Sequence, residues 1–170
     1  MKKISIALAL VSALTLSGCA AGFDAATSAQ GNSGNGRTAD VGSIQIRNAV
    51  IVVDAQTQLN ASLVATIINT ADEADALKSI EIDPAITPTF SEVVLEKNRA
   101  VSVGYNSEIS ILLTTVGKSL APSQFIDLTL VFANNESIKM SLLVVTNTDY
   151  YSDVKIPLEL ATPTPTPSAS

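Results

Sequence analysis

The fold is decided by the stretch QFIDLTLVFANNESIKMSLLV at positions 124–144. Apolar side chains occupy every second position on both sides of the pair Asn134-Asn135: Ile126, Leu128, Leu130 and Phe132 before it, then Ile138, Met140 and Leu142 after it. Successive side chains of a β-strand point to opposite faces, so this alternation predicts two half-buried strands at 124–133 and 137–144. Because Asn tolerates the left-handed backbone conformation, the pair predicts a two-residue hairpin turn between them.

Five further segments have the composition or alternation of strands. They are residues 43–53, 60–69, 77–82, 89–95 and 107–113, and in the second of them Leu63, Ala65 and Ile67 share one face. About seven short strands at such spacings are typical of a β-sandwich. No segment shows a sustained helical period, and the one helical element expected is a single turn at 72–77, capped by Thr70. We therefore predict an all-β fold, a single antiparallel β-sandwich over residues 41–160.

The N-terminus has the layout of an export signal. Lys2 and Lys3 precede an apolar run at 4–14, which is shorter than the about 20 residues that span a bilayer. The next residues, Leu16, Ser17, Gly18 and Cys19, resemble the bacterial lipoprotein box. This resemblance implies that residues 1–18 are a signal peptide, cleaved between Gly18 and Cys19, and that Cys19 carries a diacylglyceryl group. We expect a protein anchored by lipid to the extracytoplasmic face of the cell membrane.

Both ends of the expected domain are low in apolar residues. Residues 19–40 are rich in Ala, Gly, Ser and Asn, and this composition predicts a flexible tether. Residues 161–170 read ATPTPTPSAS, which favours a solvated, disordered tail. An O-glycosylated spacer is the alternative for this tail.

The composition excludes several classes of chemistry. The chain has no His and one Cys, so Ser-His or Cys-His catalysis, His-ligated zinc and an internal disulfide are impossible within it. Its 10 basic and 16 acidic residues give a net charge of −6, and removal of Lys2 and Lys3 with the signal leaves 8 basic residues and a charge of −8. This charge argues against nucleic acid as a partner.

Few other residues are candidates for a site. Asp72, Glu73 and Asp75 form the densest acidic cluster, but they lack the Asp-x-Asp-x-Asp-Gly spacing of a calcium loop, which favours a solvated turn. The pair Tyr150-Tyr151 follows the last strand, where a role at the end of the sandwich is expected rather than stacking on a ligand. Tyr105 is the remaining tyrosine. A hydrolase that uses paired carboxylates stays open, although no spacing singles out a pair.

The order of motifs resembles a known family. ATIINTADEADALKSI at 65–80 resembles the strand, Asn-containing turn and aspartate-x-leucine segment of the PCuAC periplasmic copper chaperones. Residues 110–120, 126–132 and 138–144 resemble the C-terminal half of that family. The combination of lipobox, tether, VGSIQIRN at 41–48 and Pro-rich tail is more similar to actinobacterial lipoproteins of the LpqE type. The resemblance implies a cupredoxin-like or immunoglobulin-like sandwich.

The copper ligands of that family do not carry over to this chain. The family's site is built from paired His and Met, which suit copper. Its His-x-Met positions align here with Ser110 and Leu112, and its earlier ligand segment aligns with residues 90–99, which contain neither type. Met140 is expected in the core because of its place in the alternation. We therefore predict no metal site and no cofactor.

These observations favour a non-enzymatic, lipid-anchored, exported protein that acts as an envelope accessory or interaction module. Its partners would be the membrane, through Cys19, and a protein of unknown identity. The alternative is a metal-handling relative of the copper chaperones that binds copper weakly or with ligands from a partner.

Overall fold

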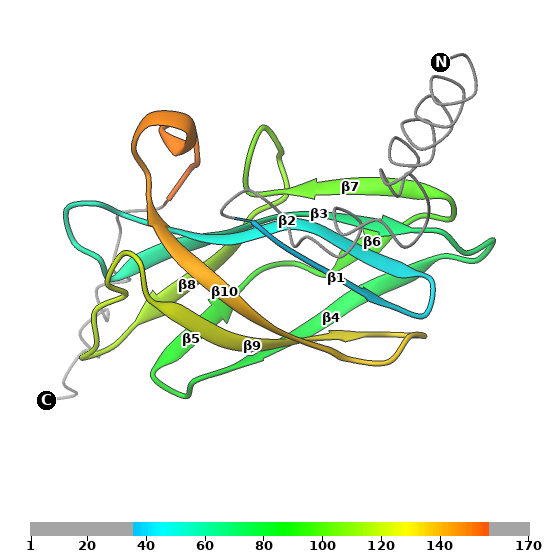
Figure 1. Cartoon of the computed structure of the whole chain (residues 1–170). Coiled ribbons are helices and arrows are strands. Elements are labelled where there is room, and N and C mark those ends of the chain that lie inside the picture. The colour runs from blue at the N-terminus through cyan, green and yellow to red at the C-terminus, as the bar shows by residue number, and fades with distance from the viewer. Residues whose placement is uncertain (1–35, 157–170) are drawn as a thin grey trace, which may run out of the picture. The chain divides into compact units, whose positions relative to one another are not determined.

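The computed structural model describes residues 36–156, which contain ten strands and one short 3₁₀ helix (Figure 1). The strands are β1 (Arg37–Val41), β2 (Ile44–Val53), β3 (Asn60–Asn69), β4 (Asp75–Ile82), β5 (Ile86–Thr89), β6 (Val93–Leu95), β7 (Arg99–Val103), β8 (Ile111–Thr115), β9 (Phe125–Phe132) and β10 (Ile138–Thr146). The helix η2 (Asp149–Tyr151) follows β10. The expected all-β fold is therefore confirmed.

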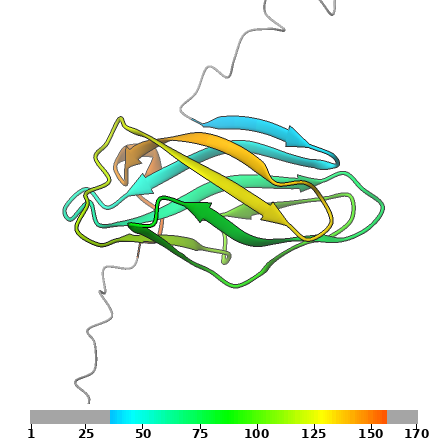
Figure 2. The same cartoon turned by 90° about the horizontal axis from the view of Figure 1, so that it is seen from below.

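The strands form one sheet in the order β5-β8-β3-β2-β10-β9-β4-β6, with β1 added to β2 and β7 added to β3. The sheet curls into two facing layers (Figure 2). Strand β10 belongs to both layers, since residues 138–143 pair with β9 and Val144–Thr146 pair with Ile51–Val53 of β2. A strand that changes sheets in this way makes the corner of a sandwich.

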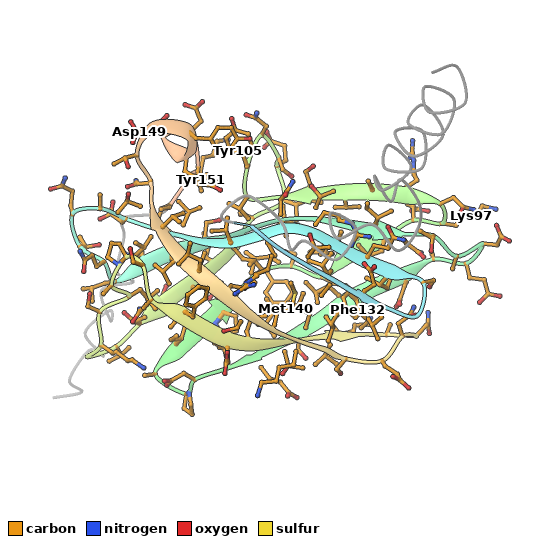
Figure 3. All side chains as sticks on the ribbon, viewed as in Figure 1. Lys97, Tyr105, Phe132, Met140, Asp149 and Tyr151 are labelled. Atoms are coloured by element: carbon orange, nitrogen blue, oxygen red, sulfur yellow. The ribbon has the colours of Figure 1, made fainter. Side chains whose placement is uncertain are left out.

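The core lies between the two layers and follows the alternation of the sequence. In β9 and β10 the buried residues include Leu128, Leu130, Phe132, Met140 and Leu142. Figure 3 labels Phe132 and Met140 within this layer of side chains. Burial of each large apolar side chain stabilises the fold by roughly 1.5–3 kcal/mol. The expectation that Met140 packs in the core is confirmed.

A second apolar cluster covers the opposite face of β2 and β3. Val50 and Val52 alternate with the core residues of β2, yet both are fully buried, together with Val64 and Val154. The segment after β10 provides this cover, and its backbone is attached to β2 because Asn147 N–H donates to the Val53 carbonyl at 3.0 Å. Both faces of β2 are therefore buried from Ala49 to Val53.

Three strands were not foreseen. β1 lies partly inside the expected tether at 19–40, β5 lies mostly between the strands expected at 77–82 and 89–95, and β7 has no counterpart in the sequence prediction. All three lie at an edge of the sheet, and most of their side chains are exposed or half-buried. Hydrophobic alternation cannot detect strands that are held mainly by backbone hydrogen bonds.

Four local predictions are wrong. The pairing of β10 with β2 is parallel, so the sandwich is not antiparallel throughout. The strand expected at 107–113 begins only at Ile111, because Ser107 Oγ donates to the Ser102 carbonyl of β7 and accepts from Ile109 N–H, which holds 107–109 in a loop. The helical turn expected at 72–77 is absent, since β4 begins at Asp75. The turn at Asn134-Asn135 is longer than two residues, because β9 ends at Phe132 and β10 begins at Ile138.

The signal peptide, Cys19, most of the expected tether and the tail at 161–170 lie outside the described residues. Within residues 36–156 no helix has the length and apolar character needed to cross a membrane.

Asp75 explains both the missing helical turn and the longer hairpin loop. It is 5% exposed, and its Oδ1 accepts hydrogen bonds from the backbone N–H groups of Ala76, Ala133 and Asn134. Its Oδ2 accepts from Asn135 Nδ2 at 2.7 Å, and Asn135 Oδ1 in turn accepts from Ser43 N–H at 3.2 Å. One carboxylate thus connects three loops at one end of the sandwich.

We expect Asp75→Ala to lower the free energy of unfolding by about 3 kcal/mol, because several buried donors lose an acceptor. Burial by itself raises the pKa of Asp75, but the hydrogen bonds outweigh it and hold the pKa below the ordinary value of 3.8. The stabilisation is therefore complete above about pH 4 and is lost as the pH falls through the folded-state pKa.

Urea denaturation of the wild type and Asp75→Asn at pH 7 and at about pH 2 measures this effect. The difference in stability between the two proteins is expected to shrink at the acidic pH. Asp127→Asn, at an exposed position of β9, is the control and should change stability by less than about 0.5 kcal/mol. An Asp75→Asn deficit that stays the same at both pH values would contradict the assignment.

Candidate functional site

The positions that the copper-chaperone resemblance marks as ligands lie at β8. Ser110 is exposed just before β8, and Leu112 is half-buried within it. Leu112 is paired with Thr89, the last residue of β5, so the start of the segment 90–99 is its neighbour. Phe90 packs against the core. These two parts of the chain meet as the resemblance implies, but they bring together a hydroxyl and apolar side chains.

The acidic cluster is separated by the fold. Asp75 is buried and accepts hydrogen bonds from loop donors, whereas Asp72 is exposed and accepts a hydrogen bond from Asn98 Nδ2 at 2.9 Å. Glu73 contributes its backbone carbonyl, which accepts from Asn69 Nδ2. Nowhere in residues 36–156 do three His, Cys, Asp or Glu residues gather in a way that could hold a metal ion.

The three tyrosines of the chain gather at one place. Tyr105 comes from the loop between β7 and β8, and Tyr150 and Tyr151 come from η2. Figure 3 labels Tyr105 and Tyr151, which lie close together. The rings of Tyr105 and Tyr150 are stacked with their centroids 5.2 Å apart. The rings of Tyr150 and Tyr151 meet edge to face at 5.1 Å. Tyr150 nevertheless remains 69% exposed.

These rings form one wall of a cleft of about 290 Å³. Its floor consists of Val64–Thr66 of β3 and Ser102–Val103 of β7, and Asn48 of β2 lies at its side. The wall and floor combine aromatic faces with the hydroxyls of Thr66 and Ser102 and the amide of Asn48. None of the described residues that line the cleft carries a charge.

Unusual backbone conformations hold the cleft residues in place. Asn48 has a φ of 54° at a bulge of β2, where the register to β3 shifts between Arg47 and Val50. Asp149, directly before Tyr150, has a φ of 51°. Backbone conformations of this kind are unfavourable for residues with a side chain, and they persist where the surrounding structure imposes them.

The loop that carries Tyr105 is fixed on both sides. Gly104 has a φ of 79°, and a Cβ there would lie 2.5 Å from the Leu63 carbonyl, so only glycine fits. Asn106 follows with a φ of 48°. Gly104 N–H donates to the Ile109 carbonyl at 2.8 Å and closes the loop. The position of Tyr105 is therefore set by the backbone as well as by its ring contacts.

The cleft lies beside the expected ligand positions. Leu112 of β8 is paired with Ser62 of β3, and Val64, the next residue on that face of β3, lines the cleft. Sequence reasoning placed Tyr150-Tyr151 at the end of the sandwich but did not connect them to Tyr105. Asn48 carried no signal, because a β-bulge is not visible in the hydrophobic pattern.

No model of a known protein family matches the chain, and no curated protein matches it. Solved structures with a similar fold do exist. The apo PCuAC domain from PmoF1 superposes with a TM-score of 0.59 at 18% identity, over 65% of this chain and 99% of that domain. The fold is PCuAC-like.

Two further structures agree with this. The copper-bound PCuAC domain from PmoF2 has a TM-score of 0.56 at 17% identity and covers 65% of this chain and 98% of that domain. The apo form of the same domain has a TM-score of 0.55 at 17% identity, with coverage of 65% and 95%. Identities this low show a shared fold and nothing about ligands. The predicted distant relationship to PCuAC domains is supported at the level of the fold.

The tyrosine cluster leads to a prediction about ionisation. Burial raises the pKa of Tyr151 above its ordinary value of 10.0, and the neighbouring Tyr150 raises it further. Tyr151 therefore keeps its hydroxyl proton at neutral pH. In an alkaline titration followed by phenolate absorbance, we expect a late phase that Tyr151→Phe removes and Tyr105→Phe retains. A late phase that survives in Tyr151→Phe would contradict this.

Proposed function

We propose that this chain is a non-enzymatic, lipid-anchored accessory protein of the cell envelope, which presents a PCuAC-like domain outside the cytoplasm and holds no copper site of its own. The observation that carries the proposal is a copper-chaperone-like fold in a chain without His, with Ser110 and Leu112 at the positions where the resemblance expects ligands. A serine hydroxyl and a leucine side chain offer copper neither the nitrogen nor the sulfur donor that it prefers.

The lipid anchor is supported by the sequence Leu16-Ser17-Gly18-Cys19 behind a short apolar run. Acyl chains on Cys19 would supply the membrane affinity, with about 0.8 kcal/mol for each buried methylene. The first strand of the described residues, β1, begins at Arg37, inside the tether expected at 19–40. The combination of lipobox, linking segment and Pro-rich tail supports kinship with actinobacterial lipoproteins of the LpqE type.

The second candidate function is metal handling with ligands supplied partly by a partner. The fold similarity to a copper-bound PCuAC domain is the observation that favours it. In that case the single methionine beyond the initiator, Met140, would not contribute, because it is buried between the two layers.

Copper titration separates the two candidates. The mature chain carrying Cys19→Ser, which removes a thiol that would itself bind Cu(I), is titrated with Cu(I) against a chelating indicator. It is expected to bind no stoichiometric copper above the chelator control, because it lacks imidazole and has no exposed thioether among its described residues. Met140→Leu should give the same result and should change stability by less than about 1.5 kcal/mol. One copper per chain at submicromolar affinity would overturn the proposal and favour metal handling.

Cell fractionation tests the anchor. In the native host, the wild-type protein is expected in the membrane fraction and in the detergent phase of a phase-separating detergent. Cys19→Ser should move it to the aqueous phase, because without the thiol no diacylglyceryl group can be attached. Ser17→Ala, which keeps the pattern of the lipoprotein box, is the matched control and should stay in the membrane. A Cys19→Ser protein that partitions like the wild type would refute lipid anchoring at this residue.

A further inference from the structure

From the cleft between η2, β3 and β7 we infer a binding site for a small neutral saccharide, with the tyrosine cluster as its stacking surface. The inference rests on the proposed function only for the location of the site outside the cytoplasm. Binding itself requires only the folded domain, whose described residues 36–156 contain an extended apolar core. Its success or failure is therefore separate from that of the lipid anchor.

The tyrosine cluster presents an exposed aromatic surface. Tyr150 is 69% exposed although its ring is in contact with Tyr105 and Tyr151. An aromatic residue that only filled space in the second apolar cluster would be covered further, as Tyr151, which is half-buried against that cluster, is. One face of a pyranose ring presents C–H groups, which pack favourably on the face of a tyrosine ring. The cleft thus offers the apolar half of a sugar site.

Polar groups line the cleft beside the tyrosine rings. The hydroxyls of Thr66 and Ser102, the amide of Asn48 and the tyrosine hydroxyls can each donate and accept hydrogen bonds. Since Tyr151 stays protonated at neutral pH, its hydroxyl keeps both capacities. Sugar hydroxyls also act as donors and acceptors at once, so the two sets of groups are complementary. In this cleft polar groups lie beside aromatic faces, and precisely placed polar groups are what fixes the orientation of a ligand in small-molecule sites.

The absence of charge among the described lining residues of the cleft restricts the class of ligand. None of its described lining residues is charged, and the whole chain carries a net charge of −6. A phosphate or carboxylate ligand would find no positive partner there, and a cation would find no carboxylate. The volume of about 290 Å³ lies at the lower end of ligand pockets. A mono- or disaccharide unit at the end of a glycan fits better than a long chain.

The backbone around the cleft residues is held in defined conformations. Asn48, Asn106 and Asp149 have positive φ values, and each lies in the cleft or directly beside a tyrosine that lines it. Gly104, which precedes Tyr105, is held against the Leu63 carbonyl. A site whose side chains are fixed before binding loses less conformational entropy when it binds.

Tyrosine fluorescence provides a direct test. The chain has no Trp and three tyrosines, all of which line the cleft, so its intrinsic emission reports on this site. The mature chain carrying Cys19→Ser is titrated with maltotriose, cellotriose and mannotriose, and with a disaccharide that contains glucuronic acid. We expect a saturable change with at least one neutral sugar and weaker binding of the charged one. Calorimetry on the same samples measures the affinity without relying on fluorescence.

Substitutions at the rings define the role of stacking. Tyr150→Ala should weaken the affinity at least roughly tenfold, and Tyr150→Phe, which keeps the ring, should stay within about threefold of the wild type. Both should fold, because Tyr150 is mostly exposed. Val116→Ala, at an exposed apolar residue after β8, is the control and should bind as the wild type does.

Three results would overturn the inference. The first is no binding of any of the neutral sugars at about 10 mM, and the second is binding that Tyr150→Ala leaves unchanged. The third is binding of the peptide ATPTPTPSAS, the sequence of residues 161–170, in place of the sugars. Proline-rich segments also dock in aromatic-lined grooves, and this outcome would assign the cleft to such a segment.

Discussion

The short parallel pairing of Val144–Thr146 with Ile51–Val53 joins the two layers of the sandwich into one curled sheet. The preceding part of β10 is bonded to β9, so a single strand aligns the inner faces of both layers. Its end also determines where the chain continues, because the segment after β10 must then cross the outer face of β2. Val154 and Tyr151 cover Val50 and Val52 there, and Tyr150 comes to rest against Tyr105. The second apolar cluster and the cleft both follow from this one corner.

How much of the fold could be predicted from the sequence depends on which interactions hold each strand in place. β9 and β10 were foreseen because their side chains alternate between core and exterior, and burial leaves that pattern in the sequence. β2 and β3 are buried on both faces over part of their length, and their apolar composition indicated them instead. β1, β5 and β7 were missed because edge strands are held by backbone hydrogen bonds, to which most residue types contribute equally. The helical turn at 72–77 failed for another reason, since Asp75 uses its carboxylate to bind loops that lie about 60 residues away in the sequence.

The candidate site was predictable only in fragments. Absence of His from the chain already argued against a copper site, and the fold adds that Leu112 and the start of segment 90–99 are indeed neighbours. The cleft, in contrast, depends on tertiary contacts between Tyr105 and Tyr150, which are far apart in the sequence, and on a bulge at Asn48. Val64 lines this cleft and lies two positions from Ser62, the partner of Leu112. A PCuAC-like fold thus places neutral and aromatic groups beside the region where the resemblance expects metal ligands.

The edges of the sheet bear on how this protein meets others. β5 contains Pro88, which has no N–H to offer a further strand, and β6 has only three residues. β1 and β7 each begin with an arginine, Arg37 and Arg99, and a charge at an edge discourages pairing with another chain. Copies crowded on one surface would therefore have little tendency to join edge to edge into aggregates. The residues at these edges therefore disfavour the addition of a further strand.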